Sequence, residues 1–113
     1  MSECLFCKIV EGEIPAKVVA ESDTALAFYD IAPQSPVHVL VIPKVHVTDI
    51  NDLDGDHPVM DDLIALVQTV VADEGIQESG YRLVVNVGVD GLQTVPHLHI
   101  HVLGGRRMTW PPG

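Results

Sequence analysis

Residues 95–105, VPHLHIHVLGG, place three of the chain's six histidines at alternate positions in an otherwise apolar run. The histidines are His97, His99 and His101, and the aliphatic residues that follow each of them are Leu98, Ile100 and Val102. Successive side chains of a β-strand point to opposite faces of its sheet. The spacing therefore predicts a strand with three imidazoles on one face and aliphatic core residues on the other. Solvated strand faces usually carry Thr, Lys, Glu or Ser, so the run favours a chemical role for the imidazoles.

The geometry of a strand disfavours a single metal ion held by all three histidines. Alternate residues lie about 6.6 Å apart along a strand, which separates His97 from His101 by about 13 Å. Zinc–nitrogen bonds are only about 2 Å long, so at most two of the three could share an ion. A catalytic row is the alternative, because imidazole is a nucleophile whose protonation is tuned near neutral pH. In such a row one histidine attacks while another hydrogen-bonds an oxyanion.

The composition restricts the class of protein. The chain has 113 residues, of which 47% are hydrophobic, and this predicts a single domain over residues 1–113. Its formal net charge of -10 argues against a nucleic-acid partner. The basic residues Arg106 and Arg107 nevertheless follow the histidines, with no acid after Asp90, so a small anionic ligand is compatible with this region.

The sequence also carries an expectation about location. No apolar run reaches the roughly 18 residues typical of a membrane span. The first ten residues, MSECLFCKIV, lack the basic region and long apolar stretch of a signal peptide. We therefore expect a cytoplasmic protein with no membrane segment.

Hydrophobic patterning predicts an α+β fold, with a five-stranded antiparallel sheet, one long helix and one short helix. The strands are expected at 16–22, 24–30, 37–43, 81–88 and 97–103, and 37–43 is apolar enough to be central. The long helix is expected over 56–75, with Asp56 as its N-cap, Pro58 in its first turn and Gly75 as its stop. Its predicted apolar face comprises Met60, Leu63, Ile64, Val67, Val70 and Val71. The short helix is expected over 4–12.

The chain resembles the histidine-triad (HIT) superfamily of nucleotide hydrolases and transferases. The segment HLHIHVL matches that family's His-x-His-x-His-x-x pattern with apolar x. The flanking segments FCKIVEGEIPAKVV, LAFYDIAPQSPVHVLVIPK and HVLGGRRMTWPPG resemble the Hint-like branch over essentially the whole chain. This resemblance implies a HIT-like fold and a homodimer in which the WPPG tail lies near the partner's active site. It also implies a purine nucleoside phosphoramidase that cleaves P–N bonds.

The resemblance also implies roles for individual residues. His99 would attack the α-phosphorus to form a covalent nucleotidyl-histidine, and His101 would hydrogen-bond the phosphate or the departing group. Asp30 and Ile31 would hold the ribose. The implied phosphate contacts are Asn86, Gln93 and Thr94, and the implied enclosure of the base comprises Leu5, Phe6, Ile9, Phe28 and Leu40.

Several of these residues have simpler interpretations. Asp30 precedes a proline-rich loop and could only form a turn, while Asn86 could cap one. Phe28 and Leu40 are typical core residues by composition. His38 and His57 carry no motif, and we interpret the first as a packed strand residue and the second as solvated.

Three positions depart from the family pattern. Leu92 stands where the family usually has glycine, just before the expected phosphate contact, and losing that glycine alters how closely the backbone can approach phosphate. Tyr29 stands where histidine is frequent. Pro96 stands where an aromatic residue is common, although proline is tolerated at the first residue of a strand. These changes bear on substrate preference and rate more than on the chemistry.

The two cysteines, Cys4 and Cys7, form a C-x-x-C pair with three interpretations. A redox dithiol lacks the expected βαβ context, and a disulfide is disfavoured in a cytosolic protein. The third is half of a zinc site. The resemblance to certain bacterial HIT proteins implies a structural zinc completed by His46 and His97. A Cys2His2 set fills all four positions of a tetrahedral ion and would attach the N-terminal segment to the sheet.

Three rival functions stay open at this point. The first is a purine-nucleotide-binding regulatory module with little turnover, which the altered Leu92 favours. The second is a dinucleoside polyphosphate hydrolase or a nucleotidyltransferase. The third is a metal-binding protein without a nucleotide site. An apolar base pocket does not distinguish adenine from guanine, and the pattern names no leaving amine.

Overall fold

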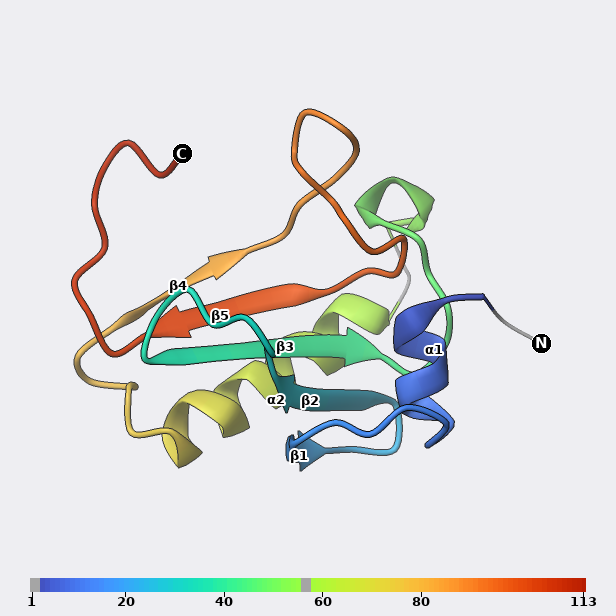
Figure 1. Ribbon diagram of the computed structural model, residues 1–113, viewed down its shortest axis with the longest axis horizontal. Helices are drawn as coiled ribbons and strands as arrows, with labels where there is room; N and C mark the ends of the chain where they lie inside the picture. The colour runs from blue at the N-terminus through green and yellow to red at the C-terminus, as the bar shows by residue number, and fades with distance from the viewer. Residues whose placement is uncertain (1–2, 56–57) are drawn as a thin grey trace.

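A single five-stranded antiparallel sheet, with strand order β1-β2-β3-β5-β4, organises the protein (Figure 1). The computed structural model describes residues 3–55 and 58–113. Its strands are β1 (Val18–Glu21), β2 (Ala25–Tyr29), β3 (Val37–Pro43), β4 (Tyr81–Val84) and β5 (Ile100–Gly104). Its helices are α1 (Leu5–Val10), the short 3-10 helix η1 (Ile50–Asp52) and α2 (Val59–Asp73). The predicted α+β class, with one long and one short α-helix, is confirmed.

The two faces of the sheet pack against different helices. In β2 and β3 the side chains alternate, so that small and β-branched residues face α2 while Leu26, Phe28, Leu40 and Ile42 face α1. In Figure 1 α2 crosses behind the sheet and α1 lies in front of it, beside the end of β3. The predicted core residues Leu98, Ile100 and Val102 belong to the α2 face. The side of the sheet that carries α1 is therefore where the histidines lie.

Helix α2 follows the prediction except at its edges. It ends before Gly75, which adopts a φ of 71°, and the amides of Gly75 and Ile76 donate to the carbonyls of Ala72 and Val71. These two bonds satisfy carbonyls that the helix itself leaves unpaired. Pro58 stands at the N-cap position without a side-chain cap, while Asp56 and His57, which carried two predictions, lie outside the described residues.

The predicted buried face of α2 is wrong at one position. Ile64 was expected in the core but is 40% exposed, whereas Leu66, which was not expected there, is only 5% exposed. The buried stripe is centred on Leu63, Leu66, Val67 and Val70, so Ile64 falls at its solvent edge.

Strand β5 begins at Ile100, three residues later than the predicted start at 97. The neighbouring strand β3 ends at Pro43, which has no amide hydrogen to donate to a longer ladder. The carbonyl of Pro43 instead accepts from the His97 ring at 2.9 Å, and the Leu98 amide donates to the Val47 carbonyl at 2.6 Å. Pro96 accordingly lies in a bend and not at the first residue of a strand.

The remaining strands differ from expectation only in length. Strand β3 has the predicted bounds and the predicted central place. Strand β4 stops at Val84, which pairs with His101 near the start of β5, so the predicted extension to 88 has little partner strand to pair with. Strands β1 and β2 are each trimmed within the predicted 16–22 and 24–30. Among the described residues, no helix has the length and apolar character needed to cross a bilayer.

Candidate active site and metal centre

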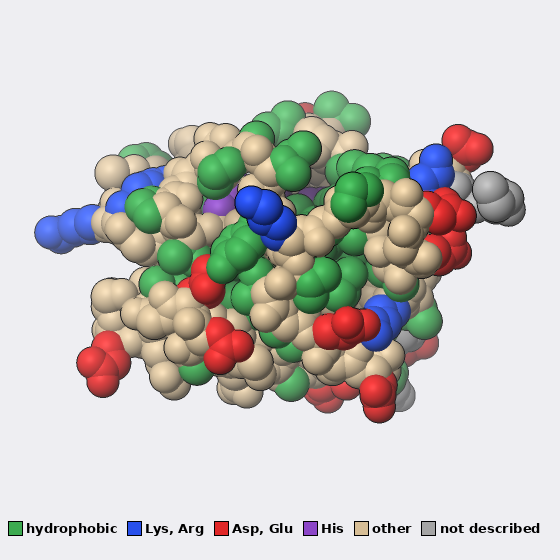
Figure 2. Space-filling view, turned by 60° about the horizontal axis from the view of Figure 1, so that its bottom comes forward, with side chains coloured by type: hydrophobic (Ala, Val, Ile, Leu, Met, Phe, Trp, Pro, Cys, Tyr) green, Lys and Arg blue, Asp and Glu red, His purple; other side chains and the backbone are tan. Residues whose placement is uncertain are grey.

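A cavity of about 320 Å³ lies between α1 and the sheet, with apolar walls and a polar end. Figure 2 shows small patches of histidine surface between hydrophobic side chains on this side of the molecule. The structure brings ten of the predicted site residues to its lining: Leu5, Phe6, Ile9, Phe28, Asp30, Ile31, Leu40, Thr94, His99 and His101. The cavity adjoins a wider depression of about 610 Å³ that shares Asp30 and also reaches Lys17 and His38. An apolar chamber with a few polar groups at one end is the usual form of a small-molecule site.

His99 is held with one ring nitrogen occupied by the backbone. It is 5% exposed, and its Nδ1 lies 2.7 Å from the carbonyl oxygen of His97. A carbonyl only accepts, so Nδ1 carries the proton and Nε2 of the neutral ring keeps its lone pair. The chain thereby presents an unprotonated nitrogen, which is the form of imidazole that acts as a nucleophile.

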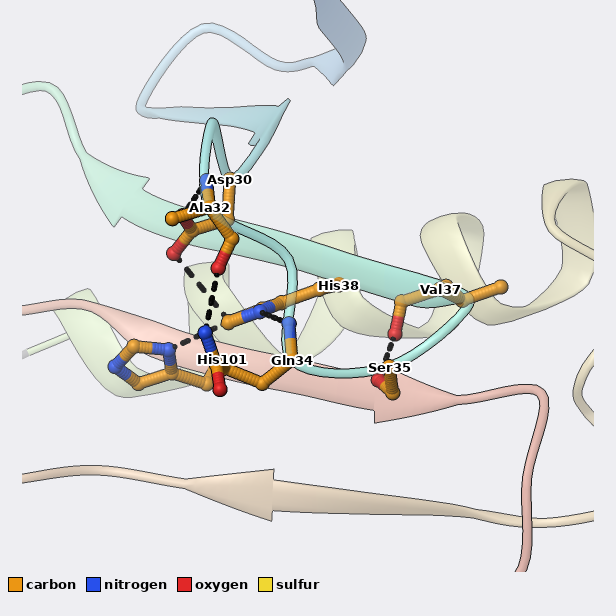
Figure 3. Close-up of polar contacts among 7 residues, drawn as sticks. All are labelled: Asp30, Ala32, Gln34, Ser35, Val37, His38 and His101. Atoms are coloured by element: carbon orange, nitrogen blue, oxygen red, sulfur yellow. Dashed lines mark hydrogen bonds and ion pairs between the residues drawn. The ribbon is translucent and has the colours of Figure 1, made fainter.

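His101 has the complementary arrangement, because a chain of hydrogen bonds ends on it (Figure 3). The Gln34 amide donates to Nδ1 of His38 at 3.0 Å, so a neutral His38 carries its proton on Nε2. That nitrogen lies 2.9 Å from Nδ1 of His101 and donates to it. The proton of a neutral His101 is consequently on Nε2, the donor that a phosphate oxygen requires.

The loop that supplies Gln34 is itself braced. The Ala32 amide donates to Oδ1 of Asp30 at 2.8 Å, and the Ser35 hydroxyl donates to the Val37 carbonyl at 2.6 Å (Figure 3). Oδ2 of Asp30 lies 3.4 Å from Nε2 of His38. Asp30 therefore forms the turn of its simpler interpretation and also lines the cavity.

Both histidines of this relay stay neutral near pH 7. Burial lowers the pKa of His38, although the nearby Asp30 carboxylate raises it. Burial, followed by the neighbouring His99 and His38 rings, lowers the pKa of His101 to about 4, against the opposing effect of Asp30. Desolvation is the main cause of the lowered pKa of both His38 and His101, because a buried imidazolium loses its hydration.

The sequence did not identify His38, which was interpreted as a packed strand residue. It is packed, at 5% exposed, but it also donates a hydrogen bond to His101, which lines the cavity. The available signal was alternation: His38 and Leu40 share a face of β3, and Leu40 pairs with His101 of β5. Without the strand order, that pairing could not be known.

Of the three residues expected to contact phosphate, one lines the cavity and two do not. Thr94 lines the cavity, whereas Asn86 and Gln93 are outside the lining that the described residues form. The Gln93 side-chain amide donates to the carbonyls of Thr48 at 2.7 Å and Val95 at 3.1 Å. Gln93 thus braces the loop against a neighbouring segment, while Asn86 is half-buried two residues after β4.

The position where the family prefers glycine has a left-handed backbone. Leu92 has a φ of 61°, the one positive φ of a non-glycine residue among the described parts of the chain, and it is 73% exposed. A side chain in this region costs roughly 1–2 kcal/mol. The preceding Gly91 is required for another reason, since a Cβ there would lie 2.3 Å from the Val87 carbonyl oxygen.

Tyr29, the second departure, is tied to the end of α2. Its hydroxyl donates to the Glu74 carboxylate at 3.0 Å, and this hydrogen bond raises the pKa of the phenol. Tyr29 also lines the cavity beside Asp30. Its polar end therefore points to a partner within the chain.

Four side chains of the types that ligate metals converge at the N-terminal end of α1. The ligand atoms of Cys4, Cys7, His46 and His97 all lie within 4.8 Å of one another. The Sγ–Nδ1 distances are 3.3 Å for Cys4–His97, 3.2 Å for Cys7–His46 and 3.5 Å for Cys7–His97. In a tetrahedral zinc site, bonds of about 2.3 Å to sulfur and about 2.0 Å to nitrogen place such atoms about 3.5 Å apart. The donor set and its spacing fit zinc.

The outer nitrogens of the two imidazoles support this fit. Nε2 of His97 donates to the Pro43 carbonyl at 2.9 Å, which leaves Nδ1 as the lone-pair donor toward the cysteines. Nε2 of His46 lies 3.4 Å from the Thr48 hydroxyl. Two thiolates and two imidazoles complete a tetrahedron without an open position, which is the composition of a structural site.

A second group of potential ligands has a different explanation. Asp30, His38 and His101 also bring three donor atoms within 4.8 Å of one another. The facing nitrogens of the two rings already share the hydrogen bond described above. We therefore assign this group to the relay.

Comparison with known proteins identifies the family of the chain. The HIT domain family matches residues 11–108. A HIT family hydrolase from Legionella pneumophila has a crystal structure that superposes with a TM-score of 0.94 at 52% identity, covering 98% of this chain and 100% of that one. Adenylylsulfatase HINT1 of Arabidopsis thaliana is 45% identical over 99% of this chain and 78% of its own length. The 14 kDa zinc-binding protein of Zea mays is 45% identical over 99% and 89% respectively. The chain belongs to the histidine-triad (HIT) family, in its Hint-like branch.

Proposed function

We propose that the protein is a nucleotide hydrolase of the phosphoramidase type, which acts through a covalent nucleotidyl intermediate on His99. The observation that carries the proposal is the pair of complementary ring forms at the polar end of one apolar cavity. His99 offers the lone pair of its Nε2, because the His97 carbonyl keeps the proton on Nδ1. His101 offers the proton of its Nε2, because His38 donates to its Nδ1. A nucleophile beside a hydrogen-bond donor is what displacement at phosphorus needs.

The base would lie between α1 and the aromatic wall of β2, and the ribose hydroxyls would donate to Asp30. Nε2 of His99 then attacks the α-phosphorus and forms a new P–N bond, while the P–N bond to the amine breaks and the departing nitrogen takes a proton from water to leave as the neutral amine. The Nε2–H of His101 donates to a phosphate oxygen while charge accumulates there. The His97 carbonyl stabilises the positive ring through Nδ1–H. Water subsequently attacks phosphorus and gives up a proton to the solvent, the bond between phosphorus and His99 breaks, and AMP or GMP is released with His99 restored.

Zinc is proposed as a structural cofactor held by Cys4, Cys7, His46 and His97. Its support is the tetrahedral spacing of the four donors and the zinc-binding name of the Zea mays relative. When bound, the ion would cross-link α1 to the sheet, and its four protein ligands would leave no coordination position open.

A second substrate class is favoured by one specific observation. The Arabidopsis relative is named an adenylylsulfatase, so adenylyl sulfate is a candidate substrate in which sulfate would be the leaving group at phosphorus. The same His99 lone pair and His101 donor would serve that reaction, because only the leaving group differs. Adenylyl sulfate is therefore the substrate to compare with the phosphoramidate.

We further propose a cytoplasmic homodimer. Edge strand β4 leaves Tyr81 41% and Leu83 39% exposed, and Trp110 of the C-terminal tail is 81% exposed. The Arg82 guanidinium lies 5.9 Å from the Trp110 ring centroid and donates to the Thr109 carbonyl, so the tail is held beside β4. Exposed aromatic side chains along an edge strand are suited to pairing with a second copy. Light scattering coupled to gel filtration tests this part.

The test of the reaction uses adenosine 5′-phosphoramidate, adenylyl sulfate and diadenosine polyphosphate as parallel substrates, with AMP followed by chromatography. We expect AMP from the phosphoramidate, and a mass increase of one adenylyl group on His99 in rapidly quenched samples. His99→Ala should abolish both signals. Faster cleavage of the polyphosphate would favour the rival hydrolase. AMP binding without turnover of any substrate would favour a regulatory binding module instead.

A further inference from the structure

Helix α1 takes part in both candidate sites at once. Cys4 is its N-cap, and Cys7 lies in its first turn and donates its amide to Sγ of Cys4 at 3.4 Å. Between and after these two metal ligands come Leu5, Phe6 and Ile9, which line the nucleotide cavity. One short helix thus carries half of the metal centre on one side and one wall of the base pocket on the other.

The Phe6 ring lies at the junction of the two sites. It is 4% exposed and meets three rings edge-on. The centroid distances are 5.5 Å to Phe28, 5.9 Å to His97 and 5.1 Å to His99. A single side chain therefore touches the base wall, a metal ligand and the nucleophile.

Helix α1 is too short to be stable by itself. It has six residues, and isolated helices below about 12–15 residues are marginal in water. Its position depends on the packing of Phe6, Ile9 and Val10 against the sheet, together with the cluster of thiols and imidazoles. Closing that cluster with an ion would fix the helix from its other side. Opening the cluster would leave only the packing contacts.

The nucleophile is connected to the metal centre by a second route. The side chain of His97 lies in the metal-binding cluster, while its backbone carbonyl accepts from Nδ1 of His99 at 2.7 Å. Fixing the His97 ring fixes the backbone that selects the ring form of His99. Through the Phe6 ring and through the His97 backbone alike, a filled metal centre would hold the nucleotide site in its binding geometry.

We propose that metal binding at Cys4, Cys7, His46 and His97 and nucleotide binding in the cavity are positively coupled, with Phe6 as the main link. The loaded metal centre holds the α1 wall in its binding geometry, so a nucleotide does not have to order it. By linkage, the nucleotide increases the affinity for the metal by the same factor. This inference rests on the proposed nucleotide site, but it concerns regulation of that site and not its chemistry.

The first experiment is calorimetric titration of AMP into the zinc-loaded protein and into the same protein stripped with a chelator. We expect AMP to bind about tenfold more weakly after stripping, within the range typical of coupled sites. The reciprocal experiment measures zinc affinity by competition with a chromophoric chelator, and AMP should increase that affinity by the same factor. Equal AMP affinity in both metal states would overturn the coupling while leaving the proposed function intact. Absence of AMP binding to the loaded protein would remove both.

Two variants distinguish the coupling through Phe6 from the affinity of the cavity for AMP. In Phe6→Leu the coupling factor should fall toward one, because the ring that joins the sites is gone, whatever the remaining affinity. Asp30→Asn is the matched control, since it weakens the ribose contact without touching α1. It should lower AMP affinity by a similar factor in both metal states and leave the coupling factor unchanged. A reduced coupling factor in the control, or an unchanged one in Phe6→Leu, would contradict the assigned link.

Hydrogen exchange distinguishes local loosening from global unfolding. Stripping the metal should accelerate exchange of the amides of Lys8 and Glu11, which donate to the Cys4 and Cys7 carbonyls. The amides of α2 on the opposite face should lose only the protection that corresponds to the lower stability of the whole domain, which is a smaller loss than in α1, and AMP should partly restore that of α1. Equal loss of protection in α1 and α2 would show that the metal acts only through the stability of the whole domain, and would overturn the local coupling.

Discussion

Nε2 of His38 lies 2.9 Å from Nδ1 of His101, and this contact determines which nitrogen of His101 carries the proton. The direction is set one step earlier, because the Gln34 amide donates to the other nitrogen of His38 at 3.0 Å. A backbone amide 67 residues before His101 in the chain therefore defines the ring form that faces the cavity.

Replacing His38 should impair catalysis without removing the nucleophile. His38→Leu deletes the donor to His101 and should lower kcat at least tenfold, because a misprotonated donor no longer stabilises the phosphate charge. His38→Gln keeps an N–H within reach and should recover part of the activity. AMP binding should change little in either variant. Ser35→Ala in the same loop is the control, and a similar loss of kcat there would assign the effect to loop disorder.

The pH dependence of stability should include a contribution from His101. Its pKa in the folded protein is lowered from 6.5 to about 4, so the unfolded chain takes up the proton first as pH falls. The contribution is fully present above about pH 6.5 and is lost progressively toward pH 4. Urea unfolding at pH 7 and pH 5 should show a larger decrease for the wild type than for His101→Asn. Equal decreases would mean that His101 titrates normally, which an NMR titration of the ring would verify.

Removing the metal should lower thermal stability. At free zinc a hundredfold above Kd, binding contributes about 2.7 kcal/mol, which corresponds to roughly 10 °C in Tm for a domain near this size. Elemental analysis should find one zinc per chain. Cys4→Ser should cost more stability than His46→Asn, because Cys4 is buried and His46 is exposed. A chelator that leaves Tm unchanged in zinc-loaded protein would exclude a structural role.

Leu92→Gly should stabilise the protein. Leu92 has a φ of 61°, and relief of that strain, about 1–2 kcal/mol, exceeds the extra chain entropy of glycine, about 0.5–1 kcal/mol. Denaturant unfolding should show a gain of roughly 0.5–1 kcal/mol. Val89→Gly, at a residue of the same loop that is 94% exposed, carries the entropy cost without that relief and should destabilise. The same sign for both variants would rule out the backbone explanation.

Periodicity predicted the elements well because most of them are governed by local sequence. The bounds of β3 and the stop of α2 at Gly75 were predictable from apolar runs and glycine chemistry. The start of β5 was not, because it depends on what β3 offers opposite it, and Pro43 offers no amide hydrogen. The exposed Ile64 was missed for a similar reason, since the sheet decides which side of an apolar helix is covered.

The four potential metal ligands illustrate the same division. The C-x-x-C pair and the two histidines were identifiable as a ligand set by resemblance, but 39 and 93 residues separate their members along the chain. Their convergence within 4.8 Å is a property of α1 packing beside the end of β3. Likewise the predicted contact residue Gln93 is recognisable in sequence, whereas its bracing role depends on the loop at Thr48.

By itself, the sequence determined the α+β class, the separation of histidines from aliphatic residues in 97–102, and the residue types available for chemistry. These follow from local rules of backbone geometry and hydrophobic burial, which act over a few residues. The tertiary structure decided which nitrogen of each histidine carries a proton, because those partners come from His38, from the His97 carbonyl and from Pro43. A ring form depends on the atom placed opposite it, and only the packed chain supplies that atom.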